Sequence, residues 1–122
     1  MEIYQQEYES FISKYKSGVQ IGGEEVGKII AILAQYFGDK NLMLAEKENT
    51  FRKKAAETIN GVDPSTLKPI SAAKAEILTD ATLEAEEYRL AKAHLENINQ
   101  YLNALKSLQK GIISESGMLG GT

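Results

Sequence analysis

Basic residues gather in one stretch of this otherwise acidic chain. Residues 51–75 hold five basic and two acidic side chains, a local charge of +3, whereas the remaining residues sum to −6. The five basic residues are Arg52, Lys53, Lys54, Lys68 and Lys74. Cations at short intervals suit a polyphosphate backbone, which rewards positive charge without regard to base sequence. The stretch therefore predicts a surface that binds single-stranded nucleic acid.

A series of lysines leads toward this stretch. Lys40, Lys47 and Lys54 follow one another at seven-residue intervals, a spacing that places them on one face of a helix. One interpretation is a line of phosphate contacts that continues into the basic stretch. The alternative is a solvated face on which the lysines pair with acidic residues farther along the chain. Those acidic residues are Glu84, Glu86 and Glu87.

Catalytic chemistry has little support in the residue types. The chain has no cysteine, and His94 is its single histidine. GGEEVGK at residues 22–28 matches the start of the phosphate-binding loop pattern, but Ile29 stands where a hydroxyl ligand of magnesium is needed. Two glutamates in that motif instead suit the first turn of a helix, where they favour its dipole. We therefore predict no catalytic residues, no metal site, no cofactor and no enzyme activity.

Breaks in the helix-forming sequence divide the chain into three predicted helices. NGVDPSTLKPIS at residues 60–71 contains both prolines and an Asn-Gly pair, and SGVQIGG at residues 17–23 is a second, softer break. The helices are expected at about residues 2–16, 24–59 and 71–115, the last as one helix or as two with a start near Asp80. Residues 1–116 are expected to form one helical domain, and residues 117–122 a flexible glycine-rich tail.

Apolar residues recur every seven positions on both long helices. Sustained seven-residue repeats on consecutive helices are typical of an antiparallel coiled-coil hairpin. The leading series are Ile30, Phe37, Leu44 and Phe51 on the second helix and Tyr88, Leu95 and Leu102 on the third. The companion series are Val26 and Leu33 on the second helix and Ala91, Ile98, Leu105 and Ile112 on the third. The predicted fold is therefore all-α.

Four aromatic residues of the first helix share one face. They are Tyr4, Tyr8, Phe11 and Tyr15. The end of the third helix shows more apolar surface, including Tyr101 and Leu108, than a two-helix contact can bury. We expect the aromatic face to cover this base of the hairpin, in the same chain or in a neighbouring copy, so the same residues are candidates for a homo-oligomer interface. The alternatives are base stacking by the aromatic rings and contact with an unspecified partner.

Composition limits the class of protein. The chain has 122 residues, a hydrophobic content of 43% and a formal charge of −3. These values are typical of a soluble globular protein. No apolar run approaches the roughly 20 residues of a membrane span, and the first residues lack the pattern of a signal peptide. We expect no membrane association and a cytoplasmic protein, in the host cytoplasm if a phage encodes it.

Residues 44–113 resemble the UvsY-type recombination mediators of phages. The likeness rests on the order of a long helix, a basic tip, ISAAKAEILTDAT (residues 70–82) and a tyrosine-anchored helix that ends NALKSLQKGI (residues 103–112). The resemblance implies a homo-oligomer that binds single-stranded DNA and helps to load a RecA-like recombinase in place of the single-strand-binding protein. It places the DNA-binding cations around Lys53, Lys54, Lys68 and Lys74.

Two classes of function remain open from the sequence. The first is a non-enzymatic DNA-binding accessory protein of phage-type recombination. The second is a structural or assembly protein, such as a virion component or scaffold, or an adaptor that binds another protein through the hairpin. The lysine series favours the first class, whereas the low net charge and the broad apolar base suit the second equally well.

Overall fold

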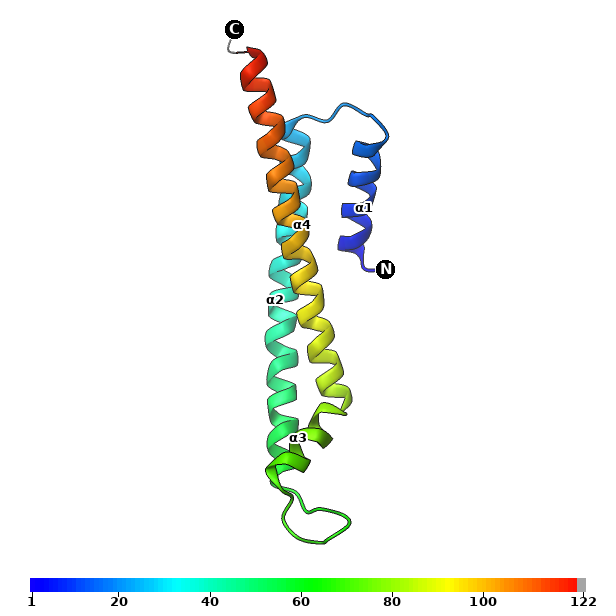
Figure 1. Cartoon of the computed structure of the whole chain (residues 1–122), viewed down its shortest axis with the longest axis vertical. Coiled ribbons are helices and arrows are strands. Elements are labelled where there is room, and N and C mark those ends of the chain that lie inside the picture. Colours follow the sequence, from blue (N-terminus) through cyan, green and yellow to red (C-terminus); the bar gives the residue numbers. More distant parts are fainter. Residues whose placement is uncertain (121–122) are drawn as a thin grey trace. The chain divides into compact units, whose positions relative to one another are not determined.

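The computed structural model describes the fold of residues 1–120 and the side chains of residues 1–115. Within this part of the chain the fold is all-α, and the only strand-like feature is an isolated bridge between Val62 and Pro69. The long helices α2 and α4 pack against each other, which confirms the predicted helical hairpin (Figure 1). The helices are α1 (Ile3–Lys16), α2 (Gly23–Ile59), α3 (Ala72–Asp80) and α4 (Leu83–Gly120).

The chain divides into two compact units. Unit 1 contains Met1–Asp39 and Glu96–Thr122, and unit 2 contains Lys40–Leu95. Both long helices contribute segments to each unit. In each unit these segments run antiparallel, because the start of α2 meets the end of α4 in unit 1 and the end of α2 meets the start of α4 in unit 2.

The apolar core lies in unit 1. Val26 and Leu33 on α2 and Ile98 and Leu105 on α4 are completely or almost completely buried. Ile30 of the expected leading series is only partly buried at the edge of this core. The companion series of α2 therefore occupies the centre of the contact with α4.

Helix α1 covers this core with its aromatic face. Tyr4 is 1% exposed, and Tyr8 stacks on Tyr101 with ring centroids 3.9 Å apart and planes 7° apart. Burial raises the pKa of both Tyr4 and Tyr8 above the ordinary value. Phe11 also packs against the core. The structure thus places these aromatic residues against the hairpin of their own chain.

Two residues of the expected base contact differ in their surroundings. Leu108 is partly buried against the core. Tyr15 lies outside the core cluster and is 43% exposed. Its helix ends one residue later at Lys16, and Gly18, with a φ of 87°, turns the chain away. Tyr15 instead lines a cavity of about 890 Å³ bounded by residues 18–22 and Ile112.

Two glycines in the first turns of α2, Gly23 and Gly27, allow α4 to pack closely. A Cβ atom at Gly23 would lie 3.2 Å from Cγ1 of Ile113, and one at Gly27 would lie 3.2 Å from Nε2 of Gln109. The same amide of Gln109 donates a hydrogen bond of 3.0 Å to the Gly23 carbonyl. The motif GGEEVGK therefore begins a helix that α4 approaches closely, and Lys28 lies within that helix.

The segment expected at residues 71–115 forms two helices. Ser71 caps α3 by accepting a hydrogen bond from the Lys74 backbone N–H, at 3.2 Å. Thr82 separates α3 from α4, because its hydroxyl donates to the Thr79 carbonyl at 2.6 Å and accepts from the Ala85 N–H at 3.2 Å. A threonine that ends one helix and caps the next explains the break.

Helix α4 extends farther than expected. Its last turn reaches Gly120, so the residues 117–120 that we expected to leave the helix belong to it. The remainder of the expected tail, residues 121–122, lies outside the described residues.

Truncation of a core leucine tests the placement of the core. Leu105→Ala removes a fully buried side chain and should lower the free energy of unfolding by about 2–5 kcal/mol. The control is Ile3→Ala at the start of α1, an isoleucine of unit 1 that is 59% exposed, where the change should stay within about 0.5 kcal/mol. Urea denaturation followed by circular dichroism measures both, and equal losses would contradict the placement of Leu105 in the core.

Candidate functional site

The lysine series lies on the face of α2 that turns toward α4. In unit 1 the same seven-residue series carries the buried residues Val26 and Leu33. In unit 2 it carries Lys40, Lys47 and Lys54, all of which are partly buried. Because the series keeps its face along the helix, the lysines extend from the hairpin contact and not from the opposite, solvated face.

Lys47 forms an ion pair with the other long helix of the hairpin, α4. Its ammonium lies 3.0 Å from a carboxylate oxygen of Glu87 on α4. Next to this pair the rings of Phe51 and Tyr88 meet at 5.1 Å, and the Lys92 ammonium lies 4.4 Å from the centre of the Tyr88 ring. One of the two sequence-based interpretations, pairing of the lysines with acids of the third predicted helix, is therefore realised at Lys47.

The cations near the end of α2 have local partners. Arg52 donates to Glu48 at 2.7 Å, one helical turn away, and this contact raises the pKa of the guanidinium further. Lys54 lies 3.9 Å from Glu57. Among the described residues, Lys53 makes no ion pair. Such exposed pairs contribute little to stability, so they order the side chains weakly and can be exchanged for other partners.

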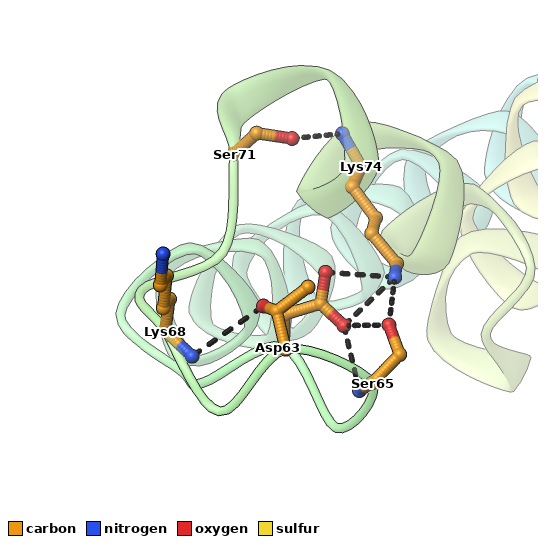
Figure 2. Close-up of polar contacts among 6 residues, drawn as sticks. Asp63, Ser65, Lys68, Ser71 and Lys74 are labelled. Carbon is orange, nitrogen blue, oxygen red and sulfur yellow. Dashed lines mark hydrogen bonds and ion pairs between the residues drawn. The ribbon is translucent and has the colours of Figure 1, made fainter.

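A polar cluster fixes the loop between α2 and α3. The Lys74 ammonium contacts both carboxylate oxygens of Asp63 at 2.8 Å, and Ser65 donates its hydroxyl at 2.6 Å and its backbone N–H at 2.9 Å to the same carboxylate. Figure 2 shows Lys74 reaching from α3 to the loop and Ser71 capping the helix. The hydrogen bonds from Lys74 and Ser65 lower the pKa of Asp63 far below its ordinary value.

Backbone hydrogen bonds complete this loop. The Asp63 N–H donates to the Lys68 carbonyl at 2.8 Å, and the Leu67 N–H donates to the Asp63 carbonyl at 2.8 Å. Leu67 adopts a left-handed conformation with a φ of 57°. Among the described residues, the Lys68 side chain makes no ion pair. The loop is thus an ordered turn, and it presents Leu67 and Lys68 at its surface.

An apolar groove of about 290 Å³ lies between α2 and α3 in unit 2. Small side chains of α3 leave the space, and apolar residues of α2 form the opposite wall. Two acidic residues, Glu76 and Asp80, also line it, and neither makes an ion pair among the described residues. The remaining lining residues are Phe51, Ala55, Ile59, Ala72, Ala75 and Thr79.

The unit that contains the basic stretch has no net charge. Unit 2 contains nine basic and nine acidic residues, and unit 1 carries the net charge of −3. The predicted DNA-binding residues all lie in unit 2. Lys47, Arg52, Lys54 and Lys74 each contact a carboxylate, while Lys53 and Lys68 do not. Within residues 51–75, Arg52 contacts an acid outside the stretch, Glu48, whereas Lys54 and Lys74 contact acids inside it, Glu57 and Asp63.

The described residues give no support to a metal site or to a membrane-spanning helix. Within the described part of the chain, no group of three or more histidine, aspartate or glutamate side chains is placed to hold a metal ion. None of the described helices combines the length and apolar character that crossing a membrane requires.

Sequence reasoning missed two features of unit 2. The Asp63 cluster had a usable signal, since Asp-Pro-Ser is a sequence typical of a turn in which the aspartate side chain accepts from the backbone two residues later. The groove had none, because its two walls are separated in the sequence by the loop.

Comparisons of the chain with protein-family models, with curated protein sequences and with solved structures found no match.

Removal of the Lys74 cation tests the Asp63 cluster. Because the folded-state pKa of Asp63 lies below its unfolded value of about 3.9, the carboxylate stabilises the fold above that pH, and this contribution is lost as the pH falls toward the folded-state pKa. Lys74→Met should raise the pKa of Asp63 and weaken the acid-side loss of stability. An NMR titration of the Asp63 carboxyl carbon measures the midpoint.

The matched control for this titration is Lys68→Met, which removes a cation of the same loop that makes no ion pair with Asp63. Its titration midpoint should stay close to that of the wild type. An unchanged midpoint in Lys74→Met would show that another interaction holds the carboxylate ionised.

Proposed function

We propose that this chain is a non-enzymatic structural or assembly protein that associates with further copies of itself, or with a partner protein, through unit 2. The observation that carries the proposal is the imbalance of apolar side chains in that unit. Ile70 is the only large apolar residue of unit 2 that is buried, whereas nine large apolar residues are exposed. They are Leu42, Met43, Ile59, Val62, Leu67, Ile77, Leu78, Leu83 and Leu90.

This imbalance favours an interaction surface for a physical reason. Single exposed apolar residues are ordinary on protein surfaces, but a unit that exposes many and buries few gains little from the hydrophobic effect on its own. Burial against another chain supplies the missing contacts. Unit 1 differs, because it buries a cluster that includes Tyr4, Leu33 and Leu105.

Electrostatics also favours protein contacts over a polyanion. Unit 2 is neutral, and four of its six candidate cations already contact carboxylates. A neutral surface of interspersed charges lacks the long-range attraction that draws nucleic acid to a basic patch. The charges instead limit which protein surfaces fit.

The mass of the protein in solution tests this proposal. We expect light scattering to give a mass above that of the 13.4 kDa chain at micromolar concentration, rising with concentration. Replacing the exposed Leu83 and Leu90 by serine should lower the mass while the helical circular dichroism remains. A strictly monomeric protein that also captures no partner through unit 2 would contradict the proposal.

Binding of single-stranded DNA, as in a recombination mediator, is a second candidate. Two observations favour it: Lys53 and Lys68 make no ion pair among the described residues, and the exposed pairs of Arg52 and Lys54 are weak enough to exchange for phosphates. In this case unit 2 contacts the strand, self-association multiplies weak contacts, and a RecA-like recombinase and a single-strand-binding protein are the partners.

A salt series distinguishes the two candidates. If the cations bind phosphates, fluorescence anisotropy with a labelled oligonucleotide should show affinity falling with salt, by about 0.7 in the log–log slope for each phosphate neutralised. Replacing Lys53 and Lys68 by alanine should flatten this slope by about 1.4. The control replaces Lys14 and Lys16 on α1 and should leave the slope unchanged. Absence of binding by the folded wild type at about 50 mM salt, where such contacts are strongest, removes this candidate.

A further inference from the structure

The loop between α2 and α3 presents a leucine in an unusual state. Leu67 is 82% exposed and has a φ of 57°, a conformation that glycine and asparagine adopt readily but leucine rarely does. The hydrogen bond from its N–H to the Asp63 carbonyl and the contact between Lys74 and the Asp63 carboxylate hold the loop in this form. A costly backbone conformation combined with a solvated leucine suggests that the side chain has a use outside its own chain.

The groove between α2 and α3 offers a site of suitable size. Its volume is about 290 Å³, while a cavity of about 150 Å³ already accommodates benzene. Phe51 and Ile59 line one wall, and Ala72 and Ala75 leave space on the other. The groove therefore has room for a branched aliphatic side chain and part of the backbone that carries it.

We propose that Leu67 of one copy docks in the groove between α2 and α3 of a second copy, with Lys68 placed against Glu76 and Asp80 at the groove's border. This inference rests on the proposed self-association and names its anchor. Leu67 supplies the buried apolar side chain, and the exposed apolar residues around it, such as Val62 and Ile59, supply further contact area.

Charge complementarity favours a second copy as the occupant. Lys68 follows Leu67 directly, and its ammonium makes no ion pair among the described residues. The groove carries two carboxylates, those of Glu76 and Asp80, that likewise make no ion pair there, although the Asp80 backbone carbonyl accepts from Arg89 at 3.3 Å. An apolar side chain beside a cation and an apolar groove beside carboxylates thus occur on the same chain, and each lacks a partner within it.

Replacement of Leu67 by asparagine tests the anchor without straining the loop. Asparagine tolerates the left-handed conformation better than leucine does, so Leu67→Asn should fold at least as well as the wild type. It should weaken self-association by about tenfold to a hundredfold, which corresponds to losing the burial of one leucine side chain. Sedimentation equilibrium measures the dissociation constant, and thermal denaturation followed by circular dichroism checks the fold. The control, Leu42→Asn, removes a leucine of α2 that is 69% exposed and lies outside the groove, and it should change association less.

An exchange of charges tests the orientation of the contact. One variant carries Lys68→Glu, and the other carries Glu76→Lys with Asp80→Lys. Each variant alone brings like charges together and should associate more weakly than the wild type. An equimolar mixture pairs opposite charges at both possible contacts and should recover association, which native mass spectrometry can detect as hetero-oligomers.

The outcomes separate this inference from the proposal beneath it. Loss of association in Leu67→Asn together with recovery in the charge-exchanged mixture supports the docking of Leu67. If Leu67→Asn associates as strongly as the wild type, the docking of Leu67 is wrong, but self-association through unit 2 still holds. A wild type that is monomeric at all accessible concentrations overturns both the docking and self-association through unit 2, and leaves only association with a partner protein.

Discussion

On α2, one seven-residue series changes from apolar residues to lysines, and the rest of the structure depends on this change. Val26 and Leu33 are buried against α4, and the next positions of the series are Lys40, Lys47 and Lys54. The boundary between the two compact units falls at Lys40. An apolar contact supports a shared core, whereas partly buried lysines need carboxylate partners and leave neighbouring apolar residues less covered. The differences between the units in core, charge balance and exposed surface follow from that change.

The same lysines show why a charge pattern along a sequence is a weak guide to a binding surface. A count over residues 51–75 gives an excess of positive charge, whereas the longer stretch 40–95, which forms unit 2, has no net charge. Antiparallel pairing brings the acids at the start of α4 beside the end of α2, and Lys47 meets Glu87 across 40 residues of sequence. A polyanion therefore has to compete with carboxylates for these cations. This competition is the physical reason to favour protein contacts as the role of unit 2.

The loop between α2 and α3 is held by hydrogen bonds and also presents exposed side chains. Asp63 is buried, and it receives hydrogen bonds from Ser65 and Lys74 while its backbone fixes Leu67 and Lys68. Ordering these groups costs conformational entropy, which the charge-assisted hydrogen bonds offset in part. A loop that is ordered before it meets a partner loses less entropy on binding than a mobile one. Its geometry thus suits recognition of another protein surface.

The sequence by itself determined the helices of this protein, and the tertiary structure decided which residues of those helices contact one another. Helical periodicity, the prolines at residues 64 and 69 and the glycines near residue 22 were enough to predict an all-α hairpin with a shorter aromatic helix, because these signals act over a few residues. The cap at Ser71 belongs to the same local level. The sequence left open whether residues 71–115 form one helix or two, since only the hydrogen bonds of Thr82 decide it. Other features depend on which residues meet in the folded chain. These are the partners of Lys47 and Lys74, the face presented by the lysine series and the groove between α2 and α3. Those meetings follow from the register of two helices and the path of a loop, which spacing along one chain does not specify.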